Sequence, residues 1–467
     1  MSEETSKTNA SGALESLAKV GNAIDQKALK PIGVPILAEP AKPITTNKYE
    51  TKWYRWYVLA ILTGVYTFNF IDRQILNILQ VPIKAEFDLA NWQLGILTGF
   101  TFAAFYVVAG IPIAKLADNG NRRNIVTIAL AVWSGMTAIS GAVFAYWQLL
   151  LARIGVAVGE AGGSPPAHSM ISDIFKKEER ATALSIYSTG INIGGLLGFL
   201  LGGWIAEFFG WRLAFLVVGI PGVLYALLFR FTVAEPPRGF AEKIEQTEDA
   251  PTMMETAKIL IQRKTFRHMA IAAGLHAFIG YGAASFNPFF WTQNHQLSLG
   301  VLGTWLAIAG LFGAFGTFLG GLTTDKLVAR DGRWYLWVPA LSTIITLPFY
   351  LVMYTWNNTQ AVLILQFIPA ITFSMYLAPN LALAHGLVGL RMRAMSSAVL
   401  FFILNIIGLG LGPFCVGLLS DLLEPSFGID NVRYSLIIII TIFNVWCVFH
   451  YWWASRTVRE DLALAPN

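Results

Sequence analysis

This sequence has little charge and almost no cysteine. Only 13% of its 467 residues are charged, whereas 55% are hydrophobic and the mean hydropathy is +0.56. A soluble globular protein of this composition would expose far more apolar surface than water tolerates, so the chain is expected to lie largely in lipid. The two cysteines, Cys415 and Cys447, lie within apolar stretches and are expected to be packing residues, which excludes a disulfide framework.

The sequence also lacks the local motifs of common enzymes. It has no Gly-Lys-Ser phosphate loop, no His-Glu-x-x-His metal pair and no nucleophile elbow, and its six histidines do not have the spacing of metal ligands. We therefore expect no catalysis, no metal ion and no other cofactor. The basic residues form no aromatic-interleaved surface, so no nucleic-acid partner is expected.

Apolar stretches long enough to cross a bilayer recur along nearly the whole sequence. A spanning helix needs about 20 mostly apolar residues. Strand-like alternation, which a membrane barrel would need, is absent. The sequence therefore predicts an all-α membrane protein with twelve transmembrane helices, centred near residues 69, 105, 135, 160, 193, 222, 279, 313, 345, 375, 406 and 444.

The basic residues are divided unequally between the two sides of the predicted bundle. Arg73 and Arg153 lie within spans, and only Lys84, Arg212 and Arg433 fall on one side. The remaining basic residues fall on the other side, which the positive-inside rule assigns to the cytoplasm. Both termini and the connection 234–267 are therefore expected in the cytoplasm, and the short tails fit a protein of the bacterial inner membrane.

The longest connection between spans divides the chain into two similar halves. Residues 110–123 (GIPIAKLADNGNRR), which end the second span, resemble residues 320–333 (GGLTTDKLVARDGR), which end the eighth. Internal repeats of this kind are typical of transporters that bind near the midplane and rock one half against the other. The expected organisation is a mobile tail (1–52), a six-helix half (53–233), a cytoplasmic connecting loop (234–267), a second six-helix half (268–455) and a cytoplasmic tail (456–467).

Glycine rows in the fifth and eleventh spans predict close helix packing. Small residues at four-residue spacing allow two helix backbones to approach each other. The rows consist of Gly194, Gly198 and Gly202 in the fifth span and Gly408, Gly412 and Gly417 in the eleventh.

Several of these segments carry a family resemblance. The pattern 118–123, Arg153 with Gly155, and the glycine row of the fifth span resemble signature motifs of the major facilitator superfamily over residues 53–456. Within it, residues 69–73 (NFIDR), 158–161 (VGEA) and 235–239 (EPPRG) resemble the Spinster family of lipid transporters. The resemblance implies the major facilitator fold and a lysolipid-like substrate. Organic-anion symporters of the same superfamily share the pattern of residues 69–73 and a glutamate on the fourth span, so a small organic anion or a sugar acid is the alternative substrate.

Four ionisable residues lie deep within predicted spans: Asp72, Arg73, Arg153 and Glu160. A charge inside the membrane costs several kcal/mol and normally faces a partner or a water-filled cavity. Burial raises the proton affinity of a carboxylate, and a neighbouring arginine lowers it again. We therefore expect Asp72, Glu160 and Arg153 to couple transport to protons. A static ion-pair network that only fixes helix contacts is the alternative.

The second half offers no such charges but many polar and aromatic side chains. Cationic groups facing an apolar and aromatic wall suit an amphiphile with an anionic head and a hydrocarbon tail. A lone membrane histidine is more often a packing residue than a ligand, so His276 has both interpretations. The expected substrate-binding residues are Arg73, Arg153, Glu160, His276, Tyr281, Tyr376 and Asn380.

The charged residues of the two repeated loops are expected to form a cytoplasmic gate that holds one state closed. These residues are Asp118, Arg122, Arg123, Asp325 and Arg333. Solvated loops that merely obey the positive-inside rule are the simpler interpretation. A channel could use the same buried charges, but paired halves favour alternating access. The expected partners are the lipid bilayer, an amphiphilic substrate and protons, and the expected state is a monomer.

Overall fold

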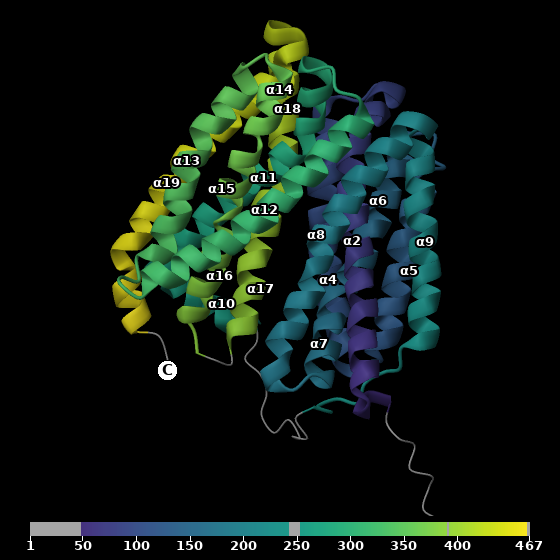
Figure 1. The fold of residues 1–467 in the computed structure, drawn as a ribbon, viewed down its shortest axis with the longest axis vertical. Coiled ribbons are helices and arrows are strands. Elements are labelled where there is room, and N and C mark those ends of the chain that lie inside the picture. Colours follow the sequence, from purple (N-terminus) through teal and green to yellow (C-terminus); the bar gives the residue numbers. More distant parts are fainter. Residues whose placement is uncertain (1–47, 242–252, 390–391, 465–467) are drawn as a thin grey trace, which may run out of the picture. The chain divides into compact units, whose positions relative to one another are not determined.

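The computed structural model describes residues 48–241, 253–389 and 392–464, and every regular element in these ranges is a helix (Figure 1). Residues 1–50 and 51–467 form two separate units, and the spanning helices belong to the second unit. The tail predicted over 1–52 lies outside the described residues up to residue 47.

The first half of the chain forms six helical spans within the described ranges. The second span is built from α3, the π-helix η2 and α4, and the fourth from α6 and α7. The bounds are α2 Lys52–Phe87, α3 Asn91–Gly95, η2 Ile96–Phe100, α4 Thr101–Asn119, α5 Arg122–Ser140, α6 Tyr146–Ala161, α7 Ser164–Ile174, α8 Lys177–Phe209 and α9 Trp211–Thr232.

The second half forms six further spans in the part of the chain that the structure describes. The tenth span is built from α14, α15 and α16, and the eleventh from α17, the π-helix η4 and α18. The bounds are α10 Met253–Gln262, α11 Lys264–Asn294, α12 Leu299–Val328, α13 Trp334–Thr355, α14 Thr359–Leu365, α15 Phe367–Ser374, α16 Leu377–Gly386, α17 Arg393–Ile403, η4 Leu404–Leu411, α18 Gly412–Phe427, η5 Gly428–Asp430 and α19 Asn431–Ala463.

These helices confirm the predicted all-α arrangement of two six-helix halves. Eight segments among the described residues are long and apolar enough to cross a membrane by length and composition, and one of them, Met395–Ala463, contains two successive spans. The other spans are α2, α5 and α6–α7, and each of α2, α5 and α6 carries at least one buried charged residue.

Proline explains where the tenth span breaks. Its ring has no N–H group and collides with the carbonyl group four residues earlier in a helix. For Pro369 that earlier residue is Leu365, the last residue of α14, and for Pro379 it is Met375, which lies between α15 and α16. In the eleventh span, η4 ends shortly before Pro413. Local sequence therefore makes two spans of the second half irregular.

Helical structure occurs in two places where the sequence analysis expected a loop or a tail. The connection predicted over 234–267 contains α10, which buries Thr256 and Leu260. The last span continues to Ala463, past the predicted limit at 455. Within this extension, the guanidinium of Arg456 lies 3.8 Å from the ring centre of Trp452, and Arg459 pairs with Asp331.

The glycine rows pack as predicted. A Cβ atom added at Gly194 of α8 would lie 2.4 Å from the carbonyl oxygen of Thr67 on α2. In the second half, a Cβ atom added at Gly412 would lie 2.4 Å from the carbonyl oxygen of Phe278 on α11. Only glycine fits where backbones approach this closely, so the fifth span packs on the first, and the eleventh on the seventh.

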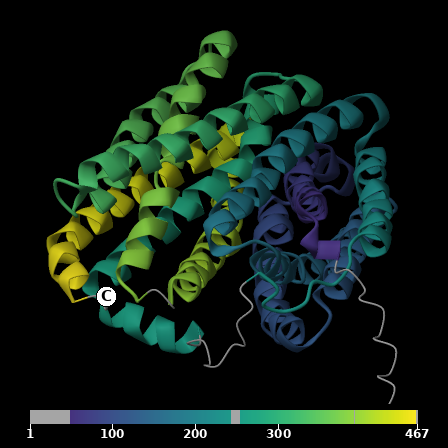
Figure 2. The same ribbon diagram turned by 60° about the horizontal axis from the view of Figure 1, so that its bottom comes forward.

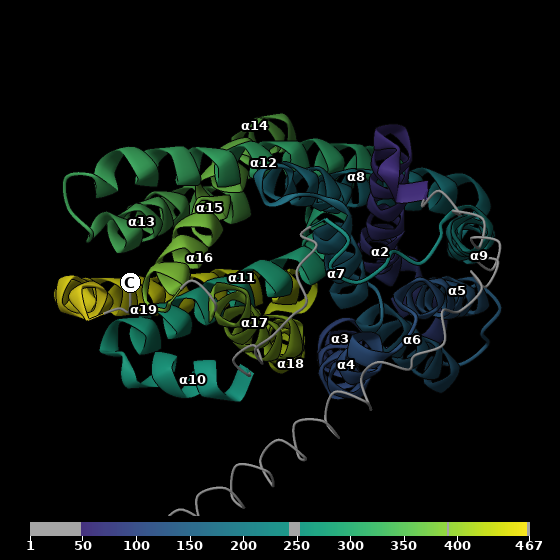
Figure 3. The ribbon, with the colours of Figure 1, turned by 90° about the horizontal axis from the view of Figure 1, so that it is seen from below.

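The two ends of the bundle hold different connections between spans. The end where the sequence places most of the basic residues is called the basic end. It holds the connections 120–121, 175–176, 233–241 and 329–333, together with α10, which lies along the second half (Figures 2 and 3). The opposite end, called the far end, holds the connections 88–90, 141–145, 295–298 and 356–358. At the far end hydrogen bonds join the halves, from Asn91 N to Asp421 at 2.9 Å and from Gly300 N to Glu207 at 2.6 Å.

Candidate functional site

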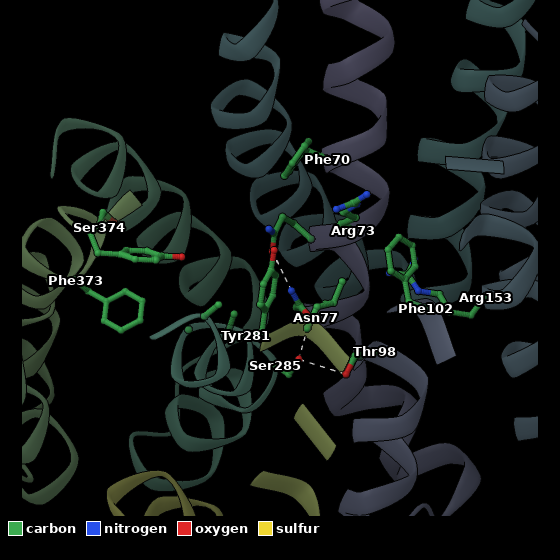
Figure 4. Close-up of a pocket in the computed structure, with 16 residues that line it drawn as sticks. Phe70, Arg73, Asn77, Thr98, Phe102, Arg153, Tyr281, Ser285, Phe373 and Ser374 are labelled. Atoms are coloured by element: carbon green, nitrogen blue, oxygen red, sulfur yellow. Dashed lines mark hydrogen bonds between the residues drawn. The ribbon is translucent and has the colours of Figure 1, made fainter. Parts of the chain in front are cut away.

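A cavity of about 410 Å³ lies between the two halves, within the range of about 300–1,000 Å³ typical of small-molecule sites (Figure 4). We call it the central cavity. Among the described residues that line it, the charged side chains are Arg73 and Arg153, both basic. The full lining is Phe70, Arg73, Gln74, Asn77, Thr98, Phe102, Arg153, Ala277, Gly280, Tyr281, Ala284, Ser285, Phe373, Ser374, Tyr376 and Leu409.

Polar contacts between the halves close the central cavity toward the far end. The hydroxyl of Ser285 on α11 lies 3.4 Å from Asn77 Oδ1 and 3.3 Å from Thr98 Oγ1, both in the first half. One turn farther along α2, Gln80 donates to the carbonyl oxygen of Ser285 at 3.1 Å. Toward the basic end, Ser188 and Ile191 of α8 are exposed. Hydrogen bonds therefore join the halves on the far-end side of the central cavity.

Arg73 and Glu160 form a direct ion pair across the first half. Arg73 Nε donates to Glu160 Oε2 at 2.6 Å, although the two residues lie 87 positions apart in sequence. The side chain of Glu160 is fully buried, whereas one fifth of the Arg73 side chain is exposed (20%) and faces the cavity. Charge-assisted hydrogen bonds of this kind are among the stronger polar contacts in proteins. Arg73 therefore joins a buried acid to the cavity wall.

Arg153 contacts the same aromatic ring as Arg73. Its guanidinium carbon is 4.7 Å from the ring centre of Phe102, and that of Arg73 is 4.9 Å from the same ring. Arg153 Nη1 contacts the backbone carbonyl oxygen of Asp72 at 3.4 Å. Its Nε atom is buried and makes no hydrogen bond in the described structure. Arg153 is therefore a cation at the cavity wall whose hydrogen-bonding capacity is only partly used.

Asp72 faces away from the central cavity. Its side chain lines a pocket of about 10 Å³ together with Thr137, Ser140 and Arg153, which is room for about one water molecule. Asp72 is 1% exposed, and neither of its carboxylate oxygens makes a hydrogen bond of ordinary geometry within the described ranges. A buried acid in this state is unfavourable unless water, a proton or a rearranged neighbour satisfies it.

The second half supplies the opposite, neutral wall. Tyr281 and Tyr376 line the cavity. His276 lies behind the wall: it is fully buried, it is 2.8 Å from the carbonyl oxygen of Phe373, and its ring is stacked 3.9 Å from Phe373 and 4.0 Å from Tyr376. Asn380 is also fully buried and donates to the hydroxyl of Tyr451 at 2.7 Å. The structure thus brings Arg73, Arg153 and the two tyrosines to the cavity, and places Glu160, His276 and Asn380 behind it.

Sequence reasoning missed the neutral side chains of the wall. Gln74 and Asn77 of α2 lie on the same helix face as Phe70 and Arg73. Residues three and four positions apart share a helix face, so a periodicity search around Arg73 would have found them. Phe102 and Phe373 gave no such signal, because phenylalanine is common throughout the spans.

A second cluster of contacts lies at the basic end of the first half. Arg122 is fully buried, pairs with Asp173, and donates from Nε to Glu235 Oε1 at 2.8 Å and from Nη2 to the carbonyl oxygen of Pro236 at 2.8 Å. The segment 235–239 therefore belongs to this cluster. Through these contacts with Arg122, the chain that follows α9 is bound to the start of α5 and the end of α7.

The residues predicted to form the cytoplasmic gate have different neighbours in the structure. The side chain of Asp118 is outside the described part of the chain. The backbone N–H of Arg123 donates to Glu235 Oε2 at 2.7 Å, which places it in the same cluster as Arg122. In the second half Asp325 is exposed, and the guanidinium of Arg333 lies 5.8 Å from the ring centre of Trp337.

In the connection 329–333 after α12, an ion pair joins two residues that were not predicted as gate residues. Arg459 Nη2 lies 2.6 Å from Asp331 Oδ2, and the guanidinium holds the pKa of the Asp331 carboxyl below its usual range. The pair links the connection after α12 to the extended end of α19.

Comparisons with known proteins agree with this architecture. The family model of the Major Facilitator Superfamily matches residues 62–406. The structure is similar to that of a bacterial homologue of the human lysosomal transporter Spinster in an inward-facing, unoccupied conformation, with a TM-score of 0.82 and 33% identity over 88% of this chain and 99% of the homologue. An MFS-type efflux pump of Mycolicibacterium smegmatis is 31% identical over 91% of this chain and 99% of its own length. A probable L-galactonate transporter of Escherichia coli is 26% identical over 62% of this chain and 66% of its own length.

The match to the superfamily model covers most of the chain, and the structural match extends over nearly the full length of the Spinster homologue. The chain therefore belongs to the Major Facilitator Superfamily, in which it is a Spinster-like membrane transporter.

Proposed function

We propose that this transporter moves an amphiphile with an anionic head and a hydrocarbon tail, drives that movement with protons, and works by alternating access as a monomer. The observation that carries the proposal is the asymmetry of the central cavity. One wall presents the guanidinium groups of Arg73 and Arg153, and the other presents Tyr281, Phe373 and Tyr376. Cationic donors recognise carboxylate or phosphate, whereas an aromatic wall suits an apolar body.

An anionic head in the cavity would compete with Glu160 for Arg73. Arg73 already reaches the cavity surface, and its Nε is held by Glu160 at 2.6 Å. If the head group takes over Arg73, Glu160 remains buried without its counter-charge and would then take up a proton. Substrate binding and protonation at one site are thereby linked, and linkage of this kind is reciprocal. Asp72, which has no hydrogen bond of ordinary geometry in the described structure, is the second candidate proton carrier.

The orientation completes the proposal. With the basic end in the cytoplasm, the described conformation is closed on the outer side, and both termini lie in the cytoplasm. A bacterial inner membrane fits this arrangement. The bilayer is also the source from which an amphiphile would reach the protein.

The test is uptake of a lysophospholipid into proteoliposomes with and without a pH gradient. Arg153→Ala should abolish uptake in a protein that is still inserted and folded. Glu160→Gln and Asp72→Asn should lose stimulation by the gradient while still binding the ligand, because each keeps its shape but cannot titrate. Wild-type stimulation in both neutral variants would refute the coupling assignment and leave the acids as members of a static ion-pair network.

A small organic anion or a sugar acid is the second candidate substrate. Its support is the similarity to the probable L-galactonate transporter, together with the same pair of cavity arginines. A ligand that binds only the folded state stabilises it by RT ln(1 + [L]/Kd), where [L] is the free ligand concentration, and so raises the melting temperature. Stabilisation of the purified protein by sugar acids and not by lysophospholipids would favour this candidate over the amphiphile.

A further inference from the structure

The outer edge of the second half carries an aromatic face on α19. In Figures 1 and 3 α19 lies at the periphery of this half, and it ends at the basic end. Trp446, Phe449 and Trp453 are exposed, and their spacing along the chain places them on one helix face. Tryptophan is enriched where a bilayer meets water, because its ring is apolar and its N–H group is polar. This face therefore marks the level of the lipid head groups on the second half.

Arg456 continues this face about one turn beyond Trp453. Its guanidinium lies 3.8 Å from the ring centre of Trp452 and 5.3 Å from that of Trp453. Stacking engages the flat face of a guanidinium, so the N–H groups along its edge stay available to an anion. The side chain is exposed and forms no ion pair within the described ranges. Tryptophan therefore holds this arginine in place while its donors are not taken by an acid.

The start of α11 lies beside the end of α19. The ring centre of His268 on α11 is 5.9 Å from that of Trp453, and its Nδ1 atom is 2.9 Å from Nδ1 of His450. Farther toward the basic end, the hydroxyl groups of Thr265 and Thr457 lie 2.8 Å apart. These contacts bring the first turns of α11 to the level of the stacked arginine.

Basic side chains predominate at this level. Lys264 and Arg267 of α11 are exposed. Asp461 accepts a hydrogen bond from the backbone N–H of Thr265 at 2.8 Å, so this acid caps the start of α11. Glu460 is exposed but lies about one turn beyond the stacked arginine, farther from the middle of the span. The surface at the level of the head groups therefore carries an excess of positive charge.

We propose that this edge binds the phosphate of an anionic phospholipid from the leaflet at the basic end. Arg456 and Arg267 supply guanidinium donors, and the aromatic face of α19 supports an acyl chain. We call these two residues, with Lys264, His268 and Trp453, the lipid edge. None of them is among the described residues that line the central cavity, so this site is separate from the one proposed for the substrate.

Two arginines of α19 offer a matched pair of variants. Arg456→Gln removes the charge at the lipid edge and keeps an amide that can form hydrogen bonds. The control is Arg459→Gln, because Arg459 lies on the same helix, is exposed, and already pairs with Asp331 at 2.6 Å. Both changes lie on the surface, so the fold should be retained in both. A double variant, Arg267→Gln with Arg456→Gln, removes both guanidinium groups of the lipid edge.

The measurement is the affinity of the purified full-length protein for phosphatidylglycerol and phosphatidylcholine with identical acyl chains, by native mass spectrometry. The first lipid has a net negative charge, whereas the ammonium of the second compensates its phosphate. A basic residue near an anionic lipid surface is worth roughly fivefold in affinity. Wild type and Arg459→Gln should therefore prefer phosphatidylglycerol, Arg456→Gln should lose about fivefold of that affinity and the double variant about 25-fold. Affinity for phosphatidylcholine should be the same in all four proteins.

Equal affinity of wild type for the two lipids would overturn the proposal. An equal loss of phosphatidylglycerol affinity in Arg459→Gln and Arg456→Gln would also overturn it, because surface charge at any position would then suffice. If inorganic phosphate raised the melting temperature of wild type as much as phosphatidylglycerol does, the occupant would be a free anion and not a lipid, contrary to the proposal. None of these measurements depends on the transported substrate, so they test the lipid edge separately from the proposed function.

Discussion

Replacing Asp421 by alanine is expected to loosen the contact between the halves at the far end. Asp421 of α18 accepts hydrogen bonds from the backbone N–H groups of Asn91 at 2.9 Å and of Trp92 at 2.7 Å. Both N–H groups belong to the first turn of α3, which has no partners for them within its own helix. A carboxylate of the second half therefore caps a helix of the first half.

The size of the effect follows from the capping geometry. Replacing a capping side chain by alanine costs about 0.5–2 kcal/mol, and the charge adds about 0.3–1 kcal/mol through the helix dipole. Water can reach the freed N–H groups because Asp421 is only half-buried, so we expect a net effect of about 1–2 kcal/mol. This shifts the ratio of conformers separated at the far end to those closed there by a factor of roughly 5–30.

Spin labels at Ala142 and Ile429, which are exposed at the far end of the first and second halves, would report this shift as a larger population of long distances. The control is Glu424→Ala. Glu424 is exposed and lies about one turn farther along α18, and its replacement by alanine also removes one negative charge. An unchanged distance distribution in Asp421→Ala would refute the reasoning. An equal shift in the control would attribute the effect to surface charge and not to capping.

Three further predictions concern orientation and stability. In a background without the native cysteines, Ala142→Cys and Ala329→Cys should react with an impermeant thiol reagent from opposite sides of the membrane, and labelling from one side would contradict the twelve-span topology. Arg122→Ala should lower the free energy of unfolding of the first half by about 3 kcal/mol in a denaturant titration, because two acids lose a buried partner. A loss below ~0.5 kcal/mol, the size of an ordinary surface substitution, would contradict the buried cluster. Because Arg459 lowers the pKa of Asp331, the stabilisation from this pair should be present above the usual aspartate pKa and disappear as the pH falls through the lower folded-state value. An Asp331→Asn variant that loses stability equally over this acidic range would contradict it.

The spans and their breaks could be predicted from sequence because both depend on local chemistry. An apolar stretch of about 20 residues crosses a bilayer whatever surrounds it. The prolines at 369 and 379 interrupt the tenth span through clashes within their own helix. The same reasoning located Arg73, Arg153 and Glu160, since a charge in an apolar span stands out without any knowledge of its neighbours.

Partners across helices could not be predicted in this way. Arg153 and Glu160 share a helix, yet Glu160 pairs with Arg73 of α2, while Arg153 contacts the backbone carbonyl oxygen of Asp72 and the ring of Phe102. Likewise, the ion pair of the loop after α12 joins Asp331 to Arg459, and not the residues singled out by the repeat. Which groups meet depends on the rotation and spacing of helices that are distant in sequence.

The central cavity belongs wholly to the tertiary structure. The sequence determined that this chain crosses the membrane as two similar halves and that the first half carries buried charge, because length, hydropathy and repetition are properties of the chain itself. Where the central cavity lies and which side chains line it was decided by the packing of the two halves. A cavity is formed by residues from several helices, so its position depends on how these helices pack against one another.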